Sequence, residues 1–400
     1  MNPPAQSRLD NARVLIYSHD TFGLGHLRRC RAIAHELVGR FKGISVLILS
    51  GSPVIGSFEF RARVDFVRIP GVIKLKDGSY TSLGLHIDLD QTMAMREAII
   101  RQTAEVFAPD LFLVDKEPLG LEGEVKHTLK MLRQSGARTV LGLRDVVDGP
   151  EALRREWDRK SALPALRELY DEIWVYGLEA FYHPLRGLDL DSEIHRKTIF
   201  TGYLKRPSVE DAFARQFDKP CILISPGGGK DGEEMVELAL RALKLRRLDV
   251  AVLVVLGPFM DEEKRAQFKG RAESMPNTTV LDYHPRIENL IENAEGLITM
   301  GGYNTFCEIL SFNKPAIVIP RTEPRTEQLI RARRASELGL ITMLEPGATS
   351  PANLLPLLEN LTTQPRPADK LPTGMLDGMD KISARIVSML SLETRPEHAA

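Results

Sequence analysis

One stretch decides the fold of this 400-residue chain: Met300-Gly301-Gly302-Tyr303-Asn304-Thr305-Phe306-Cys307-Glu308. An apolar run at residues 296–299 precedes it, and more apolar sequence follows. This order predicts a strand, a glycine turn and a helix, which aims the free N–H groups of the first helical turn at an anion. Glu308 shares a helix face with Gly301 and Thr305, so its carboxylate could accept hydrogen bonds from ribose hydroxyls. The stretch therefore predicts a nucleotide site.

Length and composition narrow the class of protein. Four hundred residues predict two domains, and the hydrophobic share of 43% and charged share of 27% are typical of a globular protein. The net charge of −1 gives no indication of nucleic-acid binding. Cys30, Cys221 and Cys307 lie too far apart for a zinc or redox pair, and they fit a reducing cytoplasm.

The chain carries no evident membrane or export signal. Its first ten residues contain no apolar signal-peptide core, and the longest apolar stretch, residues 250–256, is too short to cross a bilayer. We therefore expect a cytoplasmic protein. Peripheral contact with the inner face of the membrane stays open, because it needs only a surface patch.

Both halves of the chain alternate short β-rich runs with helix-length segments. The expected strands are residues 14–18, 44–50, 64–69, 111–115, 139–143 and 173–176, then 221–225, 251–256, 279–281, 297–299, 316–319 and 341–344. The expected helices include residues 27–38, 91–107, 122–134 and 375–391. Near-continuous apolar strands between helices indicate parallel sheets covered on both faces. The predicted fold is α/β, with two Rossmann-like, doubly wound domains facing across a cleft.

Breaker residues suggest where the domains end. Gly202 and Pro207 bracket one boundary, and a proline-rich segment at residues 362–373 marks another. We expect an N-terminal domain over residues 1–203, a C-terminal domain over 204–370, and a final helix with a frayed tail over 371–400.

The first strand runs into a glycine turn that ends at a histidine. Gly23 and Gly25 allow a tight turn before the helix that His26 opens, and the spacing is not that of a dinucleotide fingerprint. A neutral histidine there could take a proton from a sugar hydroxyl. A plain turn with a solvated histidine is the structural alternative.

Two carboxylates end strands of the first domain. Asp115 ends residues 111–115, and Asp145 follows residues 139–143. Both are candidate bases or hydroxyl acceptors. Either could instead be a helix cap.

A second glycine site follows the first strand of the second domain. Gly228 and Gly229 lie in a run of three glycines that could admit a diphosphate, without the spacing of a P-loop. Farther along, Glu327 and Gln328 open a helix, where they could reach sugar hydroxyls or cap N–H groups. The nearby arginines are interpreted for the most part as a solvated face: Arg321, Arg325, Arg331, Arg333 and Arg334.

Two Asp-x-Asp triplets could suggest a metal site. Asp88-Leu89-Asp90 and Asp189-Leu190-Asp191 both lie in polar loop sequence and are interpreted as structural. We therefore expect no bound metal and no other cofactor.

Together these residues resemble a family, the GT-B glycosyltransferases. The similarity is greatest to the MurG group, which contains the N-acetylglucosaminyltransferase of peptidoglycan synthesis, and to its family 28 C-terminal domain. It is strongest over residues 220–339, and in the first domain it rests on the glycine turn. The resemblance implies two Rossmann-like domains, a nucleotide diphospho-sugar bound mostly by the second domain, and a C-terminal helix that packs on the first.

The resemblance also assigns roles to residues of this chain. It implies that Gly228 and Gly229 lie beside the diphosphate with Gly302 and Thr305, and that Glu308 holds the ribose. Gln328, with Glu327 before it, corresponds to a glutamine pair that contacts the donor sugar. Ile287 corresponds to the loop around the base. His26 corresponds to the histidine that closes the first glycine turn.

The implied reaction is transfer of a hexose or N-acetylhexosamine from a nucleoside diphosphate sugar, with UDP favoured, to an unknown acceptor. The mechanism would be inverting and metal-independent, with His26 or Asp115 as base. Glu327 departs from the glutamine pair, which leaves the donor sugar open. The acceptor could be lipid-linked or a glycan, with residues 71–85 as its loop. Gly23, Gly25 and Asp145 are expected on the acceptor side of the site. The oligomeric state stays open.

Two other functions compete with transfer. The motif from Gly23 to Cys30 also resembles the nucleotide-sugar hydrolase of pseudaminic acid synthesis, so a hydrolase or epimerase is the first alternative. The second is a non-catalytic protein that binds nucleotide sugars.

Overall fold

The computed structural model describes residues 9, 11–19, 24–75, 79–208, 221–246 and 248–391. The chain divides into two compact units. The first unit takes the chain up to Glu179, then Pro184–Gly202 and the chain from Asp377 onward. The second unit takes Tyr203–Leu376 and the short segment Ala180–His183.

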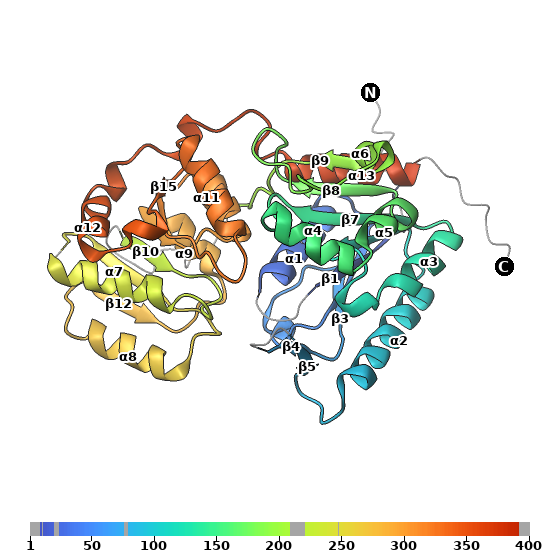
Figure 1. Ribbon diagram of the computed structural model, residues 1–400, viewed down its shortest axis with the longest axis horizontal. Helices are drawn as coiled ribbons and strands as arrows, with labels where there is room; N and C mark the ends of the chain where they lie inside the picture. The colour runs from blue at the N-terminus through green and yellow to red at the C-terminus, as the bar shows by residue number, and fades with distance from the viewer. Residues whose placement is uncertain are drawn as a thin grey trace. The chain divides into compact units, whose positions relative to one another are not determined.

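The first unit is built on one parallel sheet (Figure 1). Its described residues give seven strands in the order β3-β2-β1-β6-β7-β8-β9. The strands are β1 (Arg13–Ser18), β2 (Ser45–Ser50), β3 (Val64–Arg68), β6 (Leu111–Asp115), β7 (Arg138–Arg144), β8 (Glu172–Tyr176) and β9 (Thr198–Phe200). Every pairing between them is parallel.

The central strands are buried because helices cover both faces of this sheet. The helices of the unit are α1 (Gly25–Arg40), α2 (Leu89–Phe107), α3 (Lys126–Gln134), α4 (Pro150–Arg159), α5 (Ala162–Leu169), α6 (Ser192–Lys197) and α13 (Gly378–Ser391). Leu15 and Tyr17 of β1 join a core with Ile100 of α2 and Leu129 of α3. The alternate residues of the strand point to the opposite face. Because both faces of the sheet are buried, apolar residues follow one another without interruption along its central strands.

The last helix of the chain belongs to the first unit. Arg385 of α13 donates to Glu172 of β8, and Arg40 of α1 donates to Asp380. Asp380 lies in the first turn of α13 and Arg385 lies near its middle. The C-terminal helix is therefore part of the unit that the N-terminus begins.

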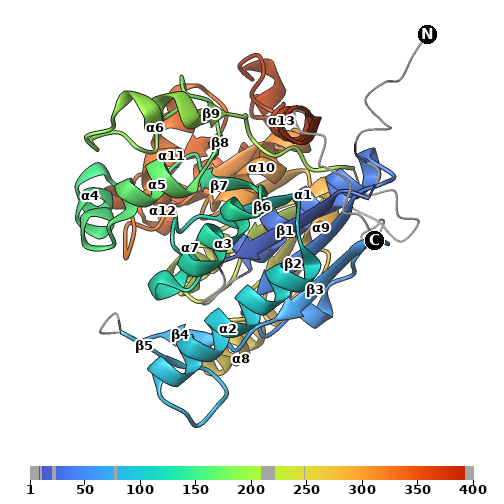
Figure 2. The ribbon, with the colours of Figure 1, turned by 90° about the vertical axis from the view of Figure 1, so that its right-hand side faces the viewer.

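A small hairpin departs from the parallel pattern. β4 (Val72–Lys74) and β5 (Tyr80–Ser82) pair antiparallel, and Figure 2 shows them beside one end of α2. The sequence prediction assigns no strand to this loop. Three-residue strands are too short to give a periodic signal.

The second unit repeats the architecture with its own parallel sheet. Its described residues give six strands in the order β12-β11-β10-β13-β14-β15. The strands are β10 (Cys221–Ser225), β11 (Ala251–Val255), β12 (Thr278–Leu281), β13 (Gly296–Thr299), β14 (Ala316–Val318) and β15 (Thr342–Met343). The helices are α7 (Glu233–Leu245), α8 (Glu262–Ala272), α9 (Ile287–Asn293), α10 (Tyr303–Ser311), α11 (Glu327–Glu337) and α12 (Pro351–Glu359). The predicted fold class of two Rossmann-like parallel-sheet domains is confirmed.

An aromatic cluster explains why Ala180–His183 groups with the second unit. The rings of Phe181 and Tyr203 meet edge to face at 5.6 Å, and Tyr203 meets Phe306 of α10 at 5.2 Å. Arg334 of α11 also donates to the Phe181 carbonyl. The sequence prediction places Phe181 in the first domain, and only these contacts assign it to the second.

Most boundaries of the elements predicted from the sequence lie within two residues of the observed ones, but two helices begin later than expected. α13 begins at Gly378 rather than at residue 375. α3 begins at Lys126 rather than at residue 122. Glu122 and Gly123 have φ angles of 48° and 93°, which a right-handed helix excludes. Among the described helices, none combines the length and apolarity that crossing a bilayer would require.

A buried ion pair ties α2 to the turn before α3. Arg96 donates from Nε to Glu124 at 2.5 Å, and both side chains are almost fully buried. Tyr17 of β1 donates to the same carboxylate, and Arg96 also donates to the Pro70 carbonyl. Burial alone would lower the pKa of Arg96, but Glu124 outweighs it and raises that pKa. Removing one partner would leave a buried charge unpaired.

We predict that Arg96→Met destabilises the protein by about 3–5 kcal/mol, the cost typical of breaking a buried ion pair from one side. Denaturant unfolding measures this change in free energy. The neighbouring Glu97→Gln is the control, because Glu97 pairs with His127 on the exposed surface and its loss should cost at most about 1 kcal/mol. Equal effects of the two substitutions would contradict a structural role for the Arg96–Glu124 pair.

Candidate active site

Each sheet has one point where the strand order reverses. In the first unit it lies between β1 and β6, and in the second unit between β10 and β13. Loops that leave neighbouring parallel strands on either side of such a point diverge, and ligands bind there at the carboxyl ends of the strands. The polar residues predicted from the sequence lie largely at these two places.

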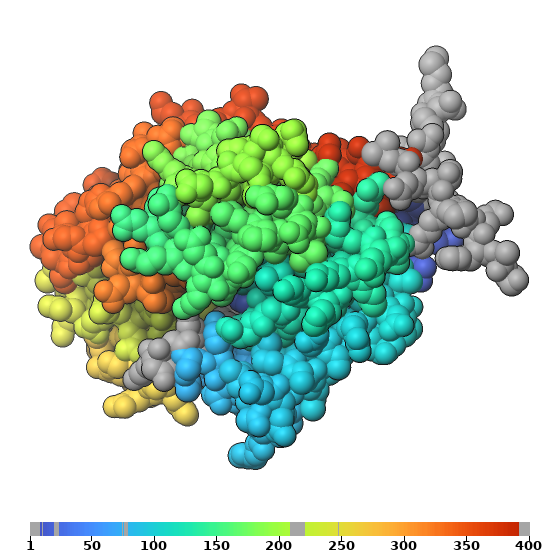
Figure 3. Space-filling view, turned by 45° about the vertical axis from the view of Figure 1, so that its right-hand side comes forward, coloured from blue at the N-terminus to red at the C-terminus, as the bar shows by residue number. Residues whose placement is uncertain are grey.

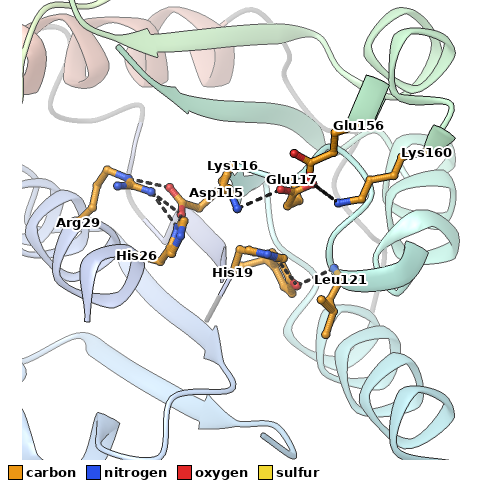
Figure 4. A network of polar contacts seen from close by, with 10 residues as sticks. His19, His26, Arg29, Asp115, Lys116, Glu117, Leu121, Glu156 and Lys160 are labelled. Carbon is orange, nitrogen blue, oxygen red and sulfur yellow. Dashed lines mark hydrogen bonds and ion pairs between the residues drawn. The ribbon is translucent and has the colours of Figure 1, made fainter. Parts of the chain in front are cut away.

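In the first unit, three charged or polar side chains meet at the switch point. His26 and Arg29 lie in the first two turns of α1, three residues apart and thus on one helix face. Both contact Asp115, the last residue of β6 (Figure 4). Arg29 binds the carboxylate with two hydrogen bonds, of 2.8 Å from Nε and 2.7 Å from Nη2. His26 Nδ1 lies 2.5 Å from Asp115 Oδ2.

The contacts of His26 decide which ring nitrogen carries the proton. Asp115 is ionised, since burial alone would raise its pKa but Arg29 and His26 outweigh burial and hold the pKa well below the usual range. An ionised carboxylate only accepts, so the proton lies on Nδ1 and is donated to Asp115. Arg29 Nη2 also comes within 3.0 Å of Nδ1, but that nitrogen then has no lone pair to offer and Arg29 donates to the carboxylate. Nε2 of His26 consequently keeps its lone pair.

His26 is neutral near pH 7. Burial lowers its pKa to about 4 and outweighs Asp115, which acts in the opposite direction, while Arg29 adds to the lowering. The ring still has 19% of its surface exposed, whereas Asp115 has 1%. A neutral imidazole with an oriented Nδ1–H and an available Nε2 is suited to accept a proton from a substrate hydroxyl.

A second group of charges lies next to the histidines. Glu117 is buried between two ammonium groups, with Lys116 Nζ at 3.1 Å and Lys160 Nζ at 2.9 Å. His19 follows β1, and its ring meets that of His26 edge to face at 5.7 Å. Burial first, and Lys116 second, hold the pKa of His19 well below its usual value. The two histidines therefore stand neutral beside a compensated cluster of charges (Figure 4).

The other acceptor-side residues lie nearby or outside the described residues. Gly25 is the first residue of α1 and is exposed, and Asp145 directly follows β7 and is fully buried. Gly23 lies outside the described residues. The roles of Gly23, Gly25 and Asp145 toward an acceptor stay predictions.

In the second unit, the glycine loop after β10 packs on the loop after β11. Gly229 has φ 95°, and an added Cβ would lie 2.6 Å from the Leu256 carbonyl oxygen. Gly257 is equally constrained, because its Cβ would lie 2.4 Å from the Gly227 oxygen. Only glycine fits these two positions. Gly228 accepts a hydrogen bond from the Phe259 N–H and remains partly exposed.

The deciding stretch forms the strand, turn and helix that its sequence predicts. Gly301, with φ 72°, turns the chain after β13, and Gly302 is the residue before α10. An added Cβ at Gly302 would meet no described atom within 4 Å, so there is room beside the helix N-terminus. Thr305 is partly exposed in the first turn, while Glu308 is only 1% exposed. Ile287 opens α9, which follows β12 at the same edge of the sheet.

Glu327 and Gln328 begin α11 and are both buried. Arg321, between β14 and α11, donates from Nη2 to Glu327 at 2.9 Å, and its backbone N–H donates to Gln328 Oε1 at 3.2 Å. Arg331 is 1% exposed and donates to the Gly301 carbonyl. The interpretation of these arginines as a solvated face is therefore wrong for Arg321 and Arg331, because both side chains bind the loops of the site. Arg333 is exposed as expected.

The two Asp-x-Asp triplets prove to be structural. Asp88 caps α2 by accepting from the Gln91 N–H, and Asp191 caps α6 by accepting from the Ile194 N–H. In the described part of the chain, no group of three or more His, Cys, Asp or Glu is placed to hold a metal ion. Metal independence stays a prediction.

Sequence reasoning missed several residues of the site. Arg29 could have been found, because it stands one helical turn after His26 and a buried aspartate at a strand end requires a cation. Glu117 and Lys160 come together from a strand end and from the end of α4, 43 residues apart. No local pattern links these two residues.

Comparison with known families agrees with this geometry. Residues 226–378 match the glycosyltransferase family 28 C-terminal domain. The match begins at the glycine loop after β10 and covers the turn before α10 and the start of α11. It therefore contains every donor-side residue named above.

Two relatives and one solved structure extend the likeness to both units. An uncharacterised glycosyltransferase of Methanopyrus kandleri is 27% identical over 205 residues, which cover 49% of this chain and just over half, 55%, of that protein. The UDP-N-acetylglucosamine–N-acetylmuramyl-(pentapeptide) pyrophosphoryl-undecaprenol N-acetylglucosamine transferase of Leifsonia xyli is 24% identical, over 67% of this chain and 78% of its own length. The crystal structure of Acinetobacter baumannii MurG matches with a TM-score of 0.56 at 13% identity, covering 96% of this chain and all of that one. The structural match supports the GT-B fold.

The named relatives are transferases, and none supports the hydrolase alternative. The domain match, the relatives and the fold agree with one another, and they leave the non-catalytic alternative without support. Residues 226–378 therefore match a glycosyltransferase family 28 C-terminal domain, and the chain as a whole is similar to MurG-like glycosyltransferases and has their GT-B fold.

Proposed function

We propose that this enzyme transfers a hexose or N-acetylhexosamine from a UDP-sugar to an acceptor hydroxyl, with inversion and without a metal ion. The observation that carries the proposal is the His26–Asp115–Arg29 array at the switch point of the first sheet. It presents a neutral, oriented base of the kind that an inverting transfer requires.

The reaction follows from what each group can do. His26 Nε2 takes the proton of the acceptor hydroxyl while that oxygen bonds to the anomeric carbon. The bond from this carbon to the diphosphate oxygen breaks, and the nucleoside diphosphate leaves with the electron pair. Because attack and departure occur on opposite faces, the anomeric configuration inverts. Asp115 stabilises the imidazolium without taking its proton, as in other His–carboxylate pairs.

The second unit would hold the donor. Amides at the N-terminus of α10 and in the glycine loop would bind the diphosphate and stabilise the charge that develops as it leaves. Glu308 would accept from the ribose hydroxyls, and Ile287 would contact the base. Glu327 and Gln328 would contact the sugar. The name of the Leifsonia relative, which includes UDP-N-acetylglucosamine, favours uridine as the base.

The acceptor is proposed to be lipid-linked, as the name of the same relative includes undecaprenol. The segment around the β4–β5 hairpin and α2 carries exposed apolar side chains, among them Leu75, Leu85 and Met95. Figure 3 shows residues of α2 in light blue at the surface of the first unit. Such side chains would suit contact with a lipid chain or with the membrane surface, so a peripheral location at the membrane is part of the proposal.

We predict that His26→Ala lowers kcat by about 10²- to 10⁴-fold, the usual contribution of a general base. Affinity for UDP, measured by calorimetry, should stay unchanged, because the base does not hold the donor. His127→Ala is the control, since His127 is exposed on α3, where it pairs with Glu97. Full turnover by His26→Ala would refute the proposed base.

We predict that Glu308→Gln weakens UDP binding by about 10- to 100-fold, the loss expected for hydrogen bonds to a charged acceptor. Calorimetry with wild type and variant measures the change. Thermal unfolding of the ligand-free proteins serves as the control for folding, because Glu308 is buried. If wild-type protein binds no nucleotide of any base, the donor site itself is wrong.

The low pKa of His26 predicts the pH dependence of kcat/KM. Activity needs the neutral ring, so it should fall only as the pH drops toward about 4, well below the ordinary histidine value. Arg29→Met removes a positive charge that lowers this pKa, so its acid limb should move to higher pH. Circular dichroism at each pH separates this shift from unfolding. An acid limb that does not move in Arg29→Met would show that Arg29 does not set the pKa of His26.

The hydrolase alternative is tested by product analysis without an acceptor. Transferase activity predicts that a UDP-sugar incubated with enzyme alone stays almost intact. Free sugar released at the rate of turnover would indicate hydrolysis, and an isomerised nucleotide sugar would indicate an epimerase.

A further inference from the structure

Arg321 joins two loops of the second unit that lie on either side of the helix α10 turn. Its guanidinium pairs through Nη1 with Asp231, in the segment between the glycine loop and α7, and through Nη2 with Glu327 at 2.9 Å. Only 25% of the Arg321 side chain is exposed. The positive charge is therefore held inside the site between two carboxylates.

The strand order places this guanidinium over the anion-binding turn. Arg321 follows β14 and Asp231 follows β10, and β13 lies between these two strands. To reach Asp231, the side chain must cross the end of β13, where Gly301 and Gly302 lead into α10. An added Cβ at Gly227 or Gly302 would meet no described atom within 4 Å, so there is space for a ligand along this path.

One donor of Arg321 is left unused. Its Nε–H is buried and has no hydrogen-bond partner among the described residues. A buried N–H without an acceptor is costly, which makes it a position that a ligand oxygen would satisfy. Of the two partners, Glu327 is 3% exposed whereas Asp231 is 41% exposed and can move into solvent.

We propose that Arg321 is a phosphate-binding residue whose guanidinium is occupied by Asp231 until a diphosphate displaces that carboxylate. This inference rests on the proposed function, because it takes the donor diphosphate as the ligand. On binding, a phosphate oxygen replaces the Asp231 carboxylate at Nη1 and accepts from Nε, while Glu327 keeps the guanidinium plane fixed. Arginine is suited to this role because its planar fork matches two phosphate oxygens.

The opposite roles of Arg321 and Asp231 make the inference testable. We would measure the affinities of UDP, uridine and inorganic pyrophosphate by calorimetry for wild type, Arg321→Gln and Asp231→Asn. Arg321→Gln should weaken UDP binding by about 10- to 100-fold and leave uridine binding unchanged, because only the phosphates lose charge-assisted hydrogen bonds. Asp231→Asn should strengthen UDP binding, because the competing carboxylate is gone.

Two further variants control for structural effects. Arg333→Gln removes an arginine of α11 that pairs with Glu345 at the surface, and it should change nothing. Arg321→Lys keeps the charge without the fork and should lose part of the UDP affinity. Thermal unfolding without ligand establishes that each variant folds.

The remaining outcomes separate this inference from the proposed function. If Asp231→Asn weakens UDP binding as much as Arg321→Gln does, or if both lose uridine binding, the pair only holds the loops together and the inference is overturned. If wild type binds neither UDP nor uridine, the proposed donor is wrong. In that case, pyrophosphate binding by wild type that is lost in Arg321→Gln would still support an anion site at Arg321. If wild type does not bind pyrophosphate either, the inference is overturned.

Discussion

The buried charge of Asp115 is the constraint on which the first unit's site depends. A carboxylate with 1% exposure at the end of a central strand is tolerated only when cations and hydrogen-bond donors compensate it. Arg29 supplies the cation through a two-bond fork, and His26 supplies one N–H. Both come from the first two turns of α1, so the start of that helix compensates the carboxylate at the end of β6. The hydrogen bond to Asp115 also places the proton of His26 on Nδ1, so that Nε2 keeps a lone pair that could accept a proton from a substrate.

The two units use one topology for different chemistry. In each sheet the first strand in chain order, β1 or β10, lies next to the fourth, β6 or β13, and the switch point falls between them. The loops that follow these strands bring their backbone and side chains to one edge of the sheet. The first unit fills this edge with buried titratable side chains, to which the proposed mechanism gives the proton transfer. The second unit fills it with glycines and a helix N-terminus, which suit a large anion that must enter and leave. In the proposed diphosphate site, Arg321 adds a fixed positive charge whose exposed partner Asp231 can move away.

Much of the fold was predictable because its signals are local. β1, β6 and β10 are apolar runs bounded by polar residues, and burial on both faces of a parallel sheet requires such runs. The turn at Gly301 and Gly302 was equally predictable, because glycines between an apolar strand and a helix indicate a tight turn. The β4–β5 hairpin and the start of α3 were not predictable. The strands of the hairpin are too short for periodicity, and the φ angles of Glu122 and Gly123 depend on the packing around them.

Sequence by itself determined that this chain has two α/β halves, with glycine turns and carboxylates at the ends of particular strands, because hydrophobic periodicity and turn residues act over a few positions. It also predicted His26, Asp115 and Glu308 as site residues, one at a time. Tertiary structure alone decided that Asp115 orients His26, that Arg29 compensates both, and that Arg321 spans from the loop after β14 to Asp231. These contacts join residues 86 to 90 positions apart. Which side chains meet across such separations depends on strand order and on the need to pair buried charge, and neither is written in any local stretch of the chain.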